Sequence, residues 1–303
     1  MKRYFLIIIS LLFISIAHAQ QIDSIAFNGG YLFFHLYGKG KPVIILTGGP
    51  GISYQQQEEV AIRVGQSYQA ILVEQRGTGR SMPAKLNKES LNMELAANDL
   101  NLILDHLHLK EATVYGHSYG SFLAMYYGAK YPNRVSQLIL TGPAPFNGTG
   151  DQMATYGDNK EARMGLLDTK ALNELDEKAA KGTITKDDEA LFRKFSNGTL
   201  LYDKSKFDQT FARVATGKIN TTTMNLMMSS VNKIDLTEAV KKFRKPITII
   251  CGRQDPLAFM AYEYQLINPS VKVHWIARAG HFAMFEQEEL FYKALFETLG
   301  QTK

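Results

Sequence analysis

The chain of 303 residues is poor in cysteine and in tryptophan, with Cys251 and Trp275 as the only examples of each. A single cysteine excludes an intramolecular disulfide. Cys251 follows an apolar run at residues 247–250. A thiol in that position is expected to be a buried core residue.

Net charge is also small, because Lys and Arg exceed Asp and Glu by only five. Without Lys2 and Arg3, which belong to a segment expected to be removed, the excess is three. A surplus this small and scattered argues against nucleic acid or a membrane surface as a partner. The sequence lacks a metal-ligand cluster, a phosphate loop and a dinucleotide fingerprint, since Gly77-Thr78-Gly79 has no third glycine or helix context. We therefore expect no cofactor and no metal.

The N-terminus carries an apolar run at residues 5–16 that two serines interrupt. This run is shorter than the about 20 apolar residues that a membrane-spanning helix needs. Two basic residues precede it, and Ala17-His18-Ala19 places small residues at the two positions that a signal peptidase reads. The pattern predicts a signal peptide at residues 1–19. The mature chain should then begin at Gln20, be secreted or periplasmic, and have no stable membrane insertion.

Short apolar runs alternate with helical patterns along the mature chain, whose composition is that of a soluble globular protein. The strand-like runs are residues 22–27, 31–37, 43–46, 70–73, 112–115, 135–140, 247–251 and 271–276, and helical patterns occupy residues 91–107, 121–130 and 285–299. Strands that alternate with helices predict βαβ units. We therefore expect an α/β fold with a mostly parallel sheet flanked by helices. Such sheets carry their sites at the carboxyl ends of the strands.

Residues 144–244 interrupt this alternation with almost no strand-like run. Five helical patterns follow one another there, placed by Asp168, Thr185, Phe207, Met224 and Asp235, the last with Glu238 at a capping-box position. We expect residues 144–244 to form a helical lid over the strand ends. Residues 20–143 and 245–303 should then form the core.

Gly116-His117-Ser118-Tyr119-Gly120 is the most informative motif in the chain. It matches the Gly-x-Ser-x-Gly pattern, with a strand-like run before it and a helical pattern after it. A sharp strand-to-helix turn of this kind raises the serine hydroxyl above the sheet. Only small residues two positions before and after the serine let the two elements approach so closely. Ser118 is therefore the predicted nucleophile.

A serine hydroxyl is a poor nucleophile unless a base takes its proton and a third group orients that base. Asp255 follows the strand-like run at residues 247–251, and His281 follows the run at residues 271–276. The chain order Ser, Asp, His is the order of an α/β-hydrolase fold. The run at residues 135–140 has no carboxylate at its end, so Asp255 is the predicted acid and His281 the predicted base.

Charge that develops on a substrate carbonyl oxygen needs two backbone N–H donors. The residue after the nucleophile, Tyr119, supplies one. The other is expected from the loop after residues 43–46, which reads Thr47-Gly48-Gly49-Pro50-Gly51. Its glycines let bare backbone approach the substrate.

These motifs resemble those of the prolyl aminopeptidase (proline iminopeptidase) family of α/β-hydrolases. Gly48-Gly49-Pro50-Gly51 is similar to the family's His-Gly-Gly-Pro-Gly loop, and residues 74–81 are similar to its Asp-Gln-Arg-Gly-x-Gly-x-Ser segment. The resemblance covers roughly residues 41–143 and 245–299. It implies an α/β-hydrolase fold, Gly49 and Tyr119 as oxyanion donors, and cleavage of a proline-like N-terminal residue from small peptides.

Three departures from the family leave the substrate open. Thr47 replaces the family's leading histidine, Tyr119 replaces its usual tryptophan, and residues 144–244 contain no tryptophan. In the family an acidic lid residue holds the substrate's amino group. The lid acids noted here are Glu161, Glu174, Glu177 and Glu189.

Three readings therefore stay open for a small-molecule or short-peptide ligand. An aminopeptidase needs a lid carboxylate that faces the pocket. A carboxylesterase with the same Ser118, Asp255 and His281 needs only an apolar pocket. A non-catalytic binding protein on a hydrolase fold usually lacks one of the three residues, and this chain retains all of them.

Overall fold

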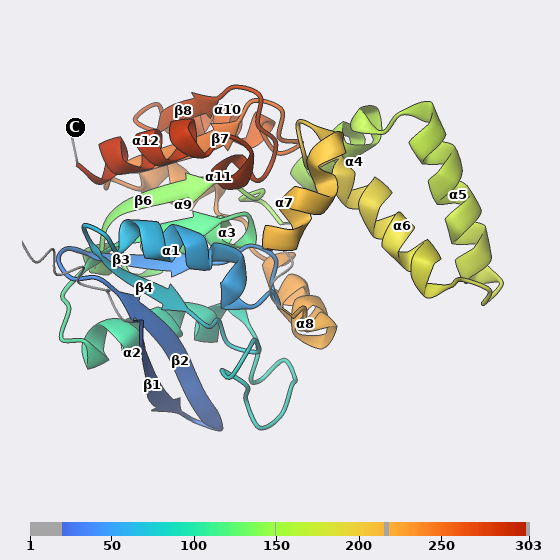
Figure 1. The fold of residues 1–303 in the computed structure, drawn as a ribbon. Helices are drawn as coiled ribbons and strands as arrows, with labels where there is room; N and C mark the ends of the chain where they lie inside the picture. Colours follow the sequence, from blue (N-terminus) through green and yellow to red (C-terminus); the bar gives the residue numbers. More distant parts are fainter. Residues whose placement is uncertain (1–19, 149, 215–217, 301–303) are drawn as a thin grey trace, which may run out of the picture.

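The computed structural model describes residues 20–148, 150–214 and 218–300, so the predicted signal peptide lies outside the described residues. Within these ranges the centre is an eight-stranded sheet with the order β1-β2-β4-β3-β5-β6-β7-β8 (Figure 1). The strands are β1 (Gln21–Phe27), β2 (Gly30–Tyr37), β3 (Pro42–Leu46), β4 (Gln69–Val73), β5 (Ala112–His117), β6 (Val135–Thr141), β7 (Ile247–Gly252) and β8 (Lys272–Ile276). Every predicted strand is present, with ends shifted by at most about two residues.

The sheet is parallel except at one edge, which confirms the expected α/β class. β1 and β2 form an antiparallel hairpin through Asn28 and Gly29, and β2 pairs antiparallel with β4. From β4 to β8 all neighbouring strands are parallel. The carboxyl ends of six strands therefore meet along one edge of the sheet, where a site is expected.

Helices cover both faces of the sheet. One hydrophobic core joins the sheet to α2 (Met93–His106), α3 (Tyr119–Lys130), α9 (Thr237–Lys242) and α10 (Phe259–Ile267). A second core, on the other face, includes α1 (Glu58–Val64), α11 (Ala283–Glu286) and α12 (Glu288–Leu299). Short 3-10 turns occupy Tyr54–Gln57, Pro132–Arg134 and Lys204–Lys206. Along β3, Ile44 lies in the first core and Ile45 in the second, as expected for a strand buried on both faces.

Two expectations about the core can be compared directly with the structure. Cys251 is fully buried in the first core, and burial raises the pKa of its thiol, which confirms the predicted core role. The prediction of a single helix over residues 285–299 is wrong, because α11 ends at Glu286 and α12 begins at Glu288. Gln287 between them has φ −141° and ψ 61°, which is not a helical conformation.

The described part of residues 144–244 contains one α-helix more than the five predicted, namely α4 (Asp151–Arg163). The other helices are α5 (Leu166–Ala180), α6 (Lys186–Gly198), α7 (Phe207–Val214), α8 (Thr221–Val231) and α9. Helices α5 and α6 project from the body as an arm, whereas α7 and α8 lie near the carboxyl end of the sheet (Figure 1). Helix α9 packs beside α3 and α10 in the first core.

The differences in this segment have local causes. Helix α4 was not predicted because none of its residues is buried, so it has no apolar period. Asp168 lies in the first turn of α5 and does not precede that helix. The capping box expected at Asp235 and Glu238 is wrong, since α9 begins at Thr237 and Asp235 accepts a hydrogen bond from the Thr237 N–H at 2.8 Å. Among the described helices, none is both long and apolar enough to cross a membrane.

Candidate active site

Ser118 sits on the turn between β5 and α3 in a conformation that serine rarely adopts. Its φ is 52° and its ψ is −121°. A Cβ atom on Gly116 would lie 2.1 Å from the Gly120 carbonyl oxygen, and one on Gly120 would lie 2.6 Å from the Thr47 carbonyl oxygen. Both glycines are therefore required by close packing. A non-glycine residue with positive φ at such a turn is a strain that the surrounding sheet must enforce.

Asp255 and His281 are brought together as predicted, beyond the ends of β7 and β8. The His281 Nδ1 atom lies 2.9 Å from Asp255 Oδ2, and the other Asp255 oxygen accepts the Leu257 N–H at 2.8 Å. Both residues are buried, with 5% of Asp255 and 7% of His281 exposed. An Nδ1–H that donates to the carboxylate leaves Nε2 as the basic nitrogen of a neutral ring.

The ring of His117 connects Ser118 to this pair. His117 directly precedes the serine, and its ring centroid lies 4.7 Å from that of His281. Its Nδ1 lies 3.1 Å from Thr141 Oγ1, which in turn donates to the Tyr115 hydroxyl. Burial lowers the pKa of His117 well below its usual range. The His117 ring is therefore neutral, and it packs against the His281 ring without adding a positive charge.

Gly142 is a second residue of the site that sequence reasoning missed. It follows β6, and its φ of +48° lies in the left-handed region. A Cβ atom there would lie 2.8 Å from His281 Nδ1 and 3.1 Å from Asp255 Oδ2. The absence of a side chain therefore leaves room for the Asp255–His281 hydrogen bond. The sequence signal was the glycine after a strand in Thr141-Gly142-Pro143, which by itself is an ordinary turn.

Hydrogen bonds hold the loop after β3 in a conformation that leaves the Gly49 N–H without an acceptor in the described part of the chain. Gln56 Oε1 accepts the Gly48 N–H at 2.6 Å, and Gln75 Nε2 donates to the Thr47 carbonyl at 3.1 Å. Gly49 has φ +50°, and among the described residues its N–H has no acceptor. Tyr119 is the first residue of α3, so its N–H has no acceptor within the helix. These are the two donors predicted for an oxyanion.

Residues 199–203, which belong to the predicted lid, are hydrogen-bonded to the loop that carries His281. The His281 N–H donates to the Leu200 carbonyl at 2.7 Å. Glu286 bridges the two parts, since it accepts the Gly280 N–H and the Tyr202 N–H, each at 2.7 Å. Burial raises the pKa of the Glu286 carboxyl. Sequence reasoning missed this bridge because the partners of Glu286 are all backbone groups.

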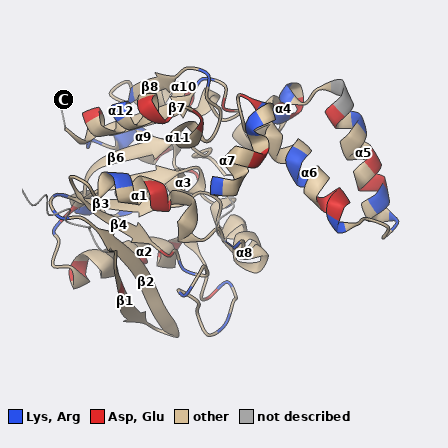
Figure 2. Cartoon of the chain, in the orientation of Figure 1, with Lys and Arg blue, Asp and Glu red and all other residues tan. Residues whose placement is uncertain are grey.

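The four lid acids noted from the sequence do not gather at the site. Helices α4, α5 and α6 carry them, and all of them are exposed: Glu161, Glu174, Glu177 and Glu189. Basic and acidic residues are spread along both helices of the arm formed by α5 and α6 (Figure 2). In α4, burial is the main influence on the pKa of Arg163 and of Tyr156, and the charge of Asp255 raises both pKa values. In the described part of the chain, no cluster of His, Cys, Asp or Glu suits a metal ion.

Comparison with known proteins places this geometry in context. A family model described as alpha/beta hydrolase fold matches residues 41–288. The AB hydrolase superfamily protein YclE of Bacillus subtilis is 25% identical over 282 residues, covering 90% of this chain and 97% of that protein. A proline iminopeptidase of Arabidopsis thaliana is 34% identical over 113 residues, which is 37% of this chain but only 29% of that protein.

Solved structures share the architecture at low sequence identity. A proline iminopeptidase structure from Mycobacterium smegmatis has a TM-score of 0.72 and 17% identity, covering 92% of this chain and 97% of that one. At that identity the likeness shows the fold alone.

Proposed function

Because the chain belongs to the α/β-hydrolase fold family, we propose that it is a serine hydrolase with Ser118 as nucleophile, His281 as base and Asp255 as the residue that orients His281. One observation carries this proposal: Asp255 Oδ2 and His281 Nδ1 lie 2.9 Å apart at the sheet edge that presents Ser118. The contact of the His117 ring with the His281 ring joins the two halves of the site.

The proposed reaction follows from these positions. Ser118 Oγ forms a bond to the substrate carbonyl carbon while its proton passes to His281 Nε2. The Gly49 and Tyr119 N–H groups donate to the oxygen that becomes negative, and the ionised Asp255 stabilises the charged imidazole. Collapse of this intermediate breaks the bond to the leaving group, which takes the proton from His281. A water molecule then releases the acyl group by the same steps.

The substrate class that we propose first is a small peptide that loses a proline-like N-terminal residue. Its support is the set of motifs at residues 48–51 and 74–81 and the partial match to a proline iminopeptidase. Such a substrate carries a free ammonium group. Its binding would need a carboxylate within reach of the site.

The second candidate, a carboxylesterase, is favoured by the charges of the lid. All four lid acids noted above are exposed, whereas Arg163 is half-buried and donates to the Thr199 and Leu201 carbonyls at 2.7 and 2.6 Å. A positive group on this side of the site repels an ammonium and tolerates a neutral or acidic substrate. This arrangement is the support for an ester as the second candidate.

The location follows from the sequence pattern and stays a proposal. We propose that residues 1–19 are removed and that the mature chain works in the periplasm or outside the cell. Gln20 is packed against the folded domain, since its side-chain amide donates to the Tyr37 hydroxyl at 2.9 Å. Intact-mass measurement of protein from a secreting host should give a chain that starts at Gln20.

The test of the function compares labelling with turnover. A fluorophosphonate probe should label the wild type and should leave Ser118→Ala unlabelled. Proline amides and short acyl esters are then assayed in parallel with both proteins, because their ratio separates the two substrate classes. A folded wild type that neither reacts with the probe nor hydrolyses either class would support the non-catalytic binding reading.

A further inference from the structure

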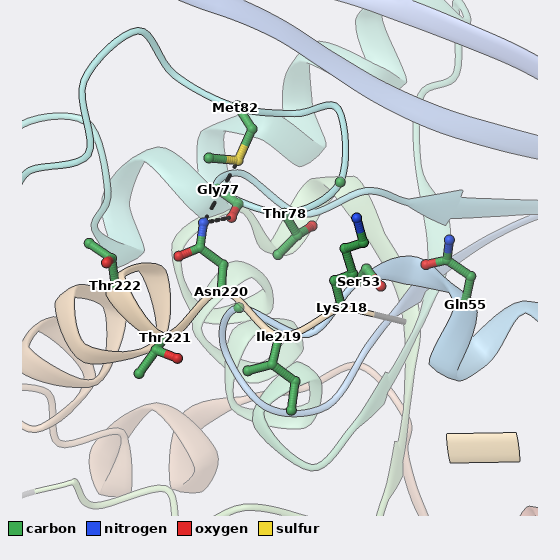
Figure 3. Close-up of a pocket in the computed structure, with 12 residues that line it drawn as sticks. Ser53, Gln55, Gly77, Thr78, Met82, Lys218, Ile219, Asn220, Thr221 and Thr222 are labelled. Atoms are coloured by element: carbon green, nitrogen blue, oxygen red, sulfur yellow. Dashed lines mark hydrogen bonds between the residues drawn. The ribbon is translucent and has the colours of Figure 1, made fainter. Parts of the chain in front are cut away.

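A cavity of about 650 Å³ lies beside the loop that carries Gly49. Three segments line it: residues 51–55 after β3, residues 77–82 after β4, and residues 218–222 at the start of α8 (Figure 3). Ser118, Asp255 and His281 are not among its lining residues. β3 lies between β4 and β5 in the sheet, so the loops after β3 and β4 place the cavity on the β4 side of the serine turn.

Backbone hydrogen bonds fix the lid wall of this cavity to the loop after β3. The Ser53 N–H donates to the Lys218 carbonyl at 3.3 Å, and the Asn220 N–H donates to the Gly51 carbonyl at 2.8 Å. Ile52 and Ile219 form the β-bridge between these bonds. In the same loop the Ile52 N–H donates to the Gly49 carbonyl at 3.1 Å. The cavity is thus built onto the loop that is expected to hold the substrate carbonyl.

Two buried polar groups in the cavity wall have no partner. Ser53 is 3% exposed, and its hydroxyl makes no hydrogen bond with any described residue. Gln55 Oε1 is likewise buried without a partner. Buried polar groups are nearly always satisfied in folded proteins, so two unsatisfied ones in a single cavity indicate ligand atoms that would complete them.

The charge of the cavity selects an anion. Lys218 is the only charged residue among the described residues that line it, and Lys218 has no ion pair with them. The N-terminus of α8 adds the N–H groups of Thr221 and Thr222, and Asn220 already caps the Thr223 N–H. Figure 3 shows Lys218, Ser53 and Gln55 on one side of the cavity and Asn220, Thr221 and Thr222 on the other.

We propose that this cavity binds the free carboxylate of a small substrate, with Lys218 and Ser53 as its ligands. Gln55 Oε1 then accepts an N–H or O–H next to that carboxylate. The C-terminus of a dipeptide and the acid arm of a dicarboxylic half-ester both present this chemistry. As a substrate subsite, the cavity rests on the serine-hydrolase function proposed above.

The first experiment uses matched pairs of substrates that differ only in that group. Each pair joins a free acid to its primary amide: prolylglycine with prolylglycinamide, and monomethyl succinate with its amide. Wild type should prefer the acid at least about tenfold in kcat/KM in the pair that it hydrolyses. Lys218→Met should remove the preference and leave the amide within about twofold. Lys186→Met, an exposed lysine on α6, is the matched control and should keep the preference.

The second experiment measures binding without turnover. Ser118→Ala is titrated calorimetrically with N-acetylglycine and with its amide. The titration is repeated with two double variants, in which Lys218→Met or Ser53→Ala is combined with Ser118→Ala. One outcome is that N-acetylglycine binds to Ser118→Ala and loses this binding in both double variants, while the wild type shows no acid preference in turnover. That combination would show that the cavity binds a free carboxylic acid and not the carboxylate of a substrate. No acid preference and no binding would overturn the proposal. Probe labelling of Ser118 in the wild type and in Lys218→Met would show that the hydrolase stands while the subsite falls.

Discussion

The sheet edge and the α5–α6 arm differ in how much freedom their side chains have. At the edge, Asp255 and His281 are buried and hydrogen-bonded to each other. They pack so closely against Gly142 that no side chain fits at that position. On the arm, Lys178 pairs with Asp188 and Lys181 with Glu177 at the surface. Exposed pairs of this kind contribute about 0–1 kcal/mol to stability. Chemistry therefore resides where geometry is over-determined, and the arm can change with little effect on the fold.

Two lid segments connect these regions. Residues 199–203 are fastened to the His281 loop, and residues 218–220 are fastened to the loop that carries Gly49. The predicted lid therefore contacts the loop of the predicted base on one side of the site and the loop of the predicted oxyanion donor on the other. Substitutions that compare the edge, these attachments and the arm should give effects of decreasing size.

The largest effect is expected from Ser118→Ala. Removal of the nucleophile should lower kcat by about 10⁴-fold or more, with a melting temperature close to that of the wild type. Single-turnover assays with the better substrate class would measure the loss. A variant that keeps more than a tenth of the activity would rule out Ser118 as the nucleophile.

Gly142→Ala should come next, with kcat lowered about 10²-fold and KM nearly unchanged. The added methyl group would lie against His281 Nδ1 and would displace the ring from its working position. Gly157→Ala in α4 is the control, because a Cβ atom there meets nothing within 4 Å. The control should keep full activity and gain about 0.5–1 kcal/mol of stability. Equal effects of the two changes would contradict the role given to Gly142.

Glu286→Gln should have a smaller effect that depends on pH. The amide nitrogen cannot accept the Gly280 N–H, so the melting temperature should fall by a few degrees. Burial raises the pKa of Glu286 in the folded state. Its contribution to stability is therefore full below the pKa of the unfolded chain and declines as pH rises through the folded pKa.

Thermal unfolding of both proteins at several pH values would test this bridge. The stability difference between wild type and Glu286→Gln should be largest at acid pH and should narrow as pH rises. A difference that widens with pH would show that the carboxylate, and not the protonated acid, holds the lid segment.

The smallest effect is expected from the amide variants of the exposed lid acids Glu161, Glu174, Glu177 and Glu189. If the ester reading holds, each change should leave KM within about twofold for every substrate, because a solvated carboxylate has no contact to lose. Initial rates with a free-amine substrate and its N-blocked analogue would be compared. A strong rise in KM for the free amine alone would identify the ammonium ligand of an aminopeptidase.

The fold was predictable where a pattern is local. Apolar runs located the strands, and the glycines around Ser118 located the turn, because steric limits on the backbone act within a few residues. Asp255 and His281 could be paired from chain order, since parallel strands bring their carboxyl ends together.

What could not be predicted depends on which loops meet in space. The sequence around Gly142 gives no sign that His281 lies against it. Glu286 lies in a short helix, and its carboxyl group accepts hydrogen bonds from backbone groups that no sequence motif marks. Helix α4 has no buried residue, so periodicity could not find it. The direction in which the lid acids face is set by the packing of α4, α5 and α6, which their sequence does not encode locally.

The strained backbone at Ser118 sets stability against activity at a single position. A non-glycine residue with φ 52° and ψ −121° costs about 1–3 kcal/mol, which glycine would relieve. Directed evolution that sorts variants by heat resistance would therefore enrich glycine at position 118 and discard the nucleophile. A thermostable form of this protein has to be sought by screens that score turnover together with survival, with position 118 held as serine.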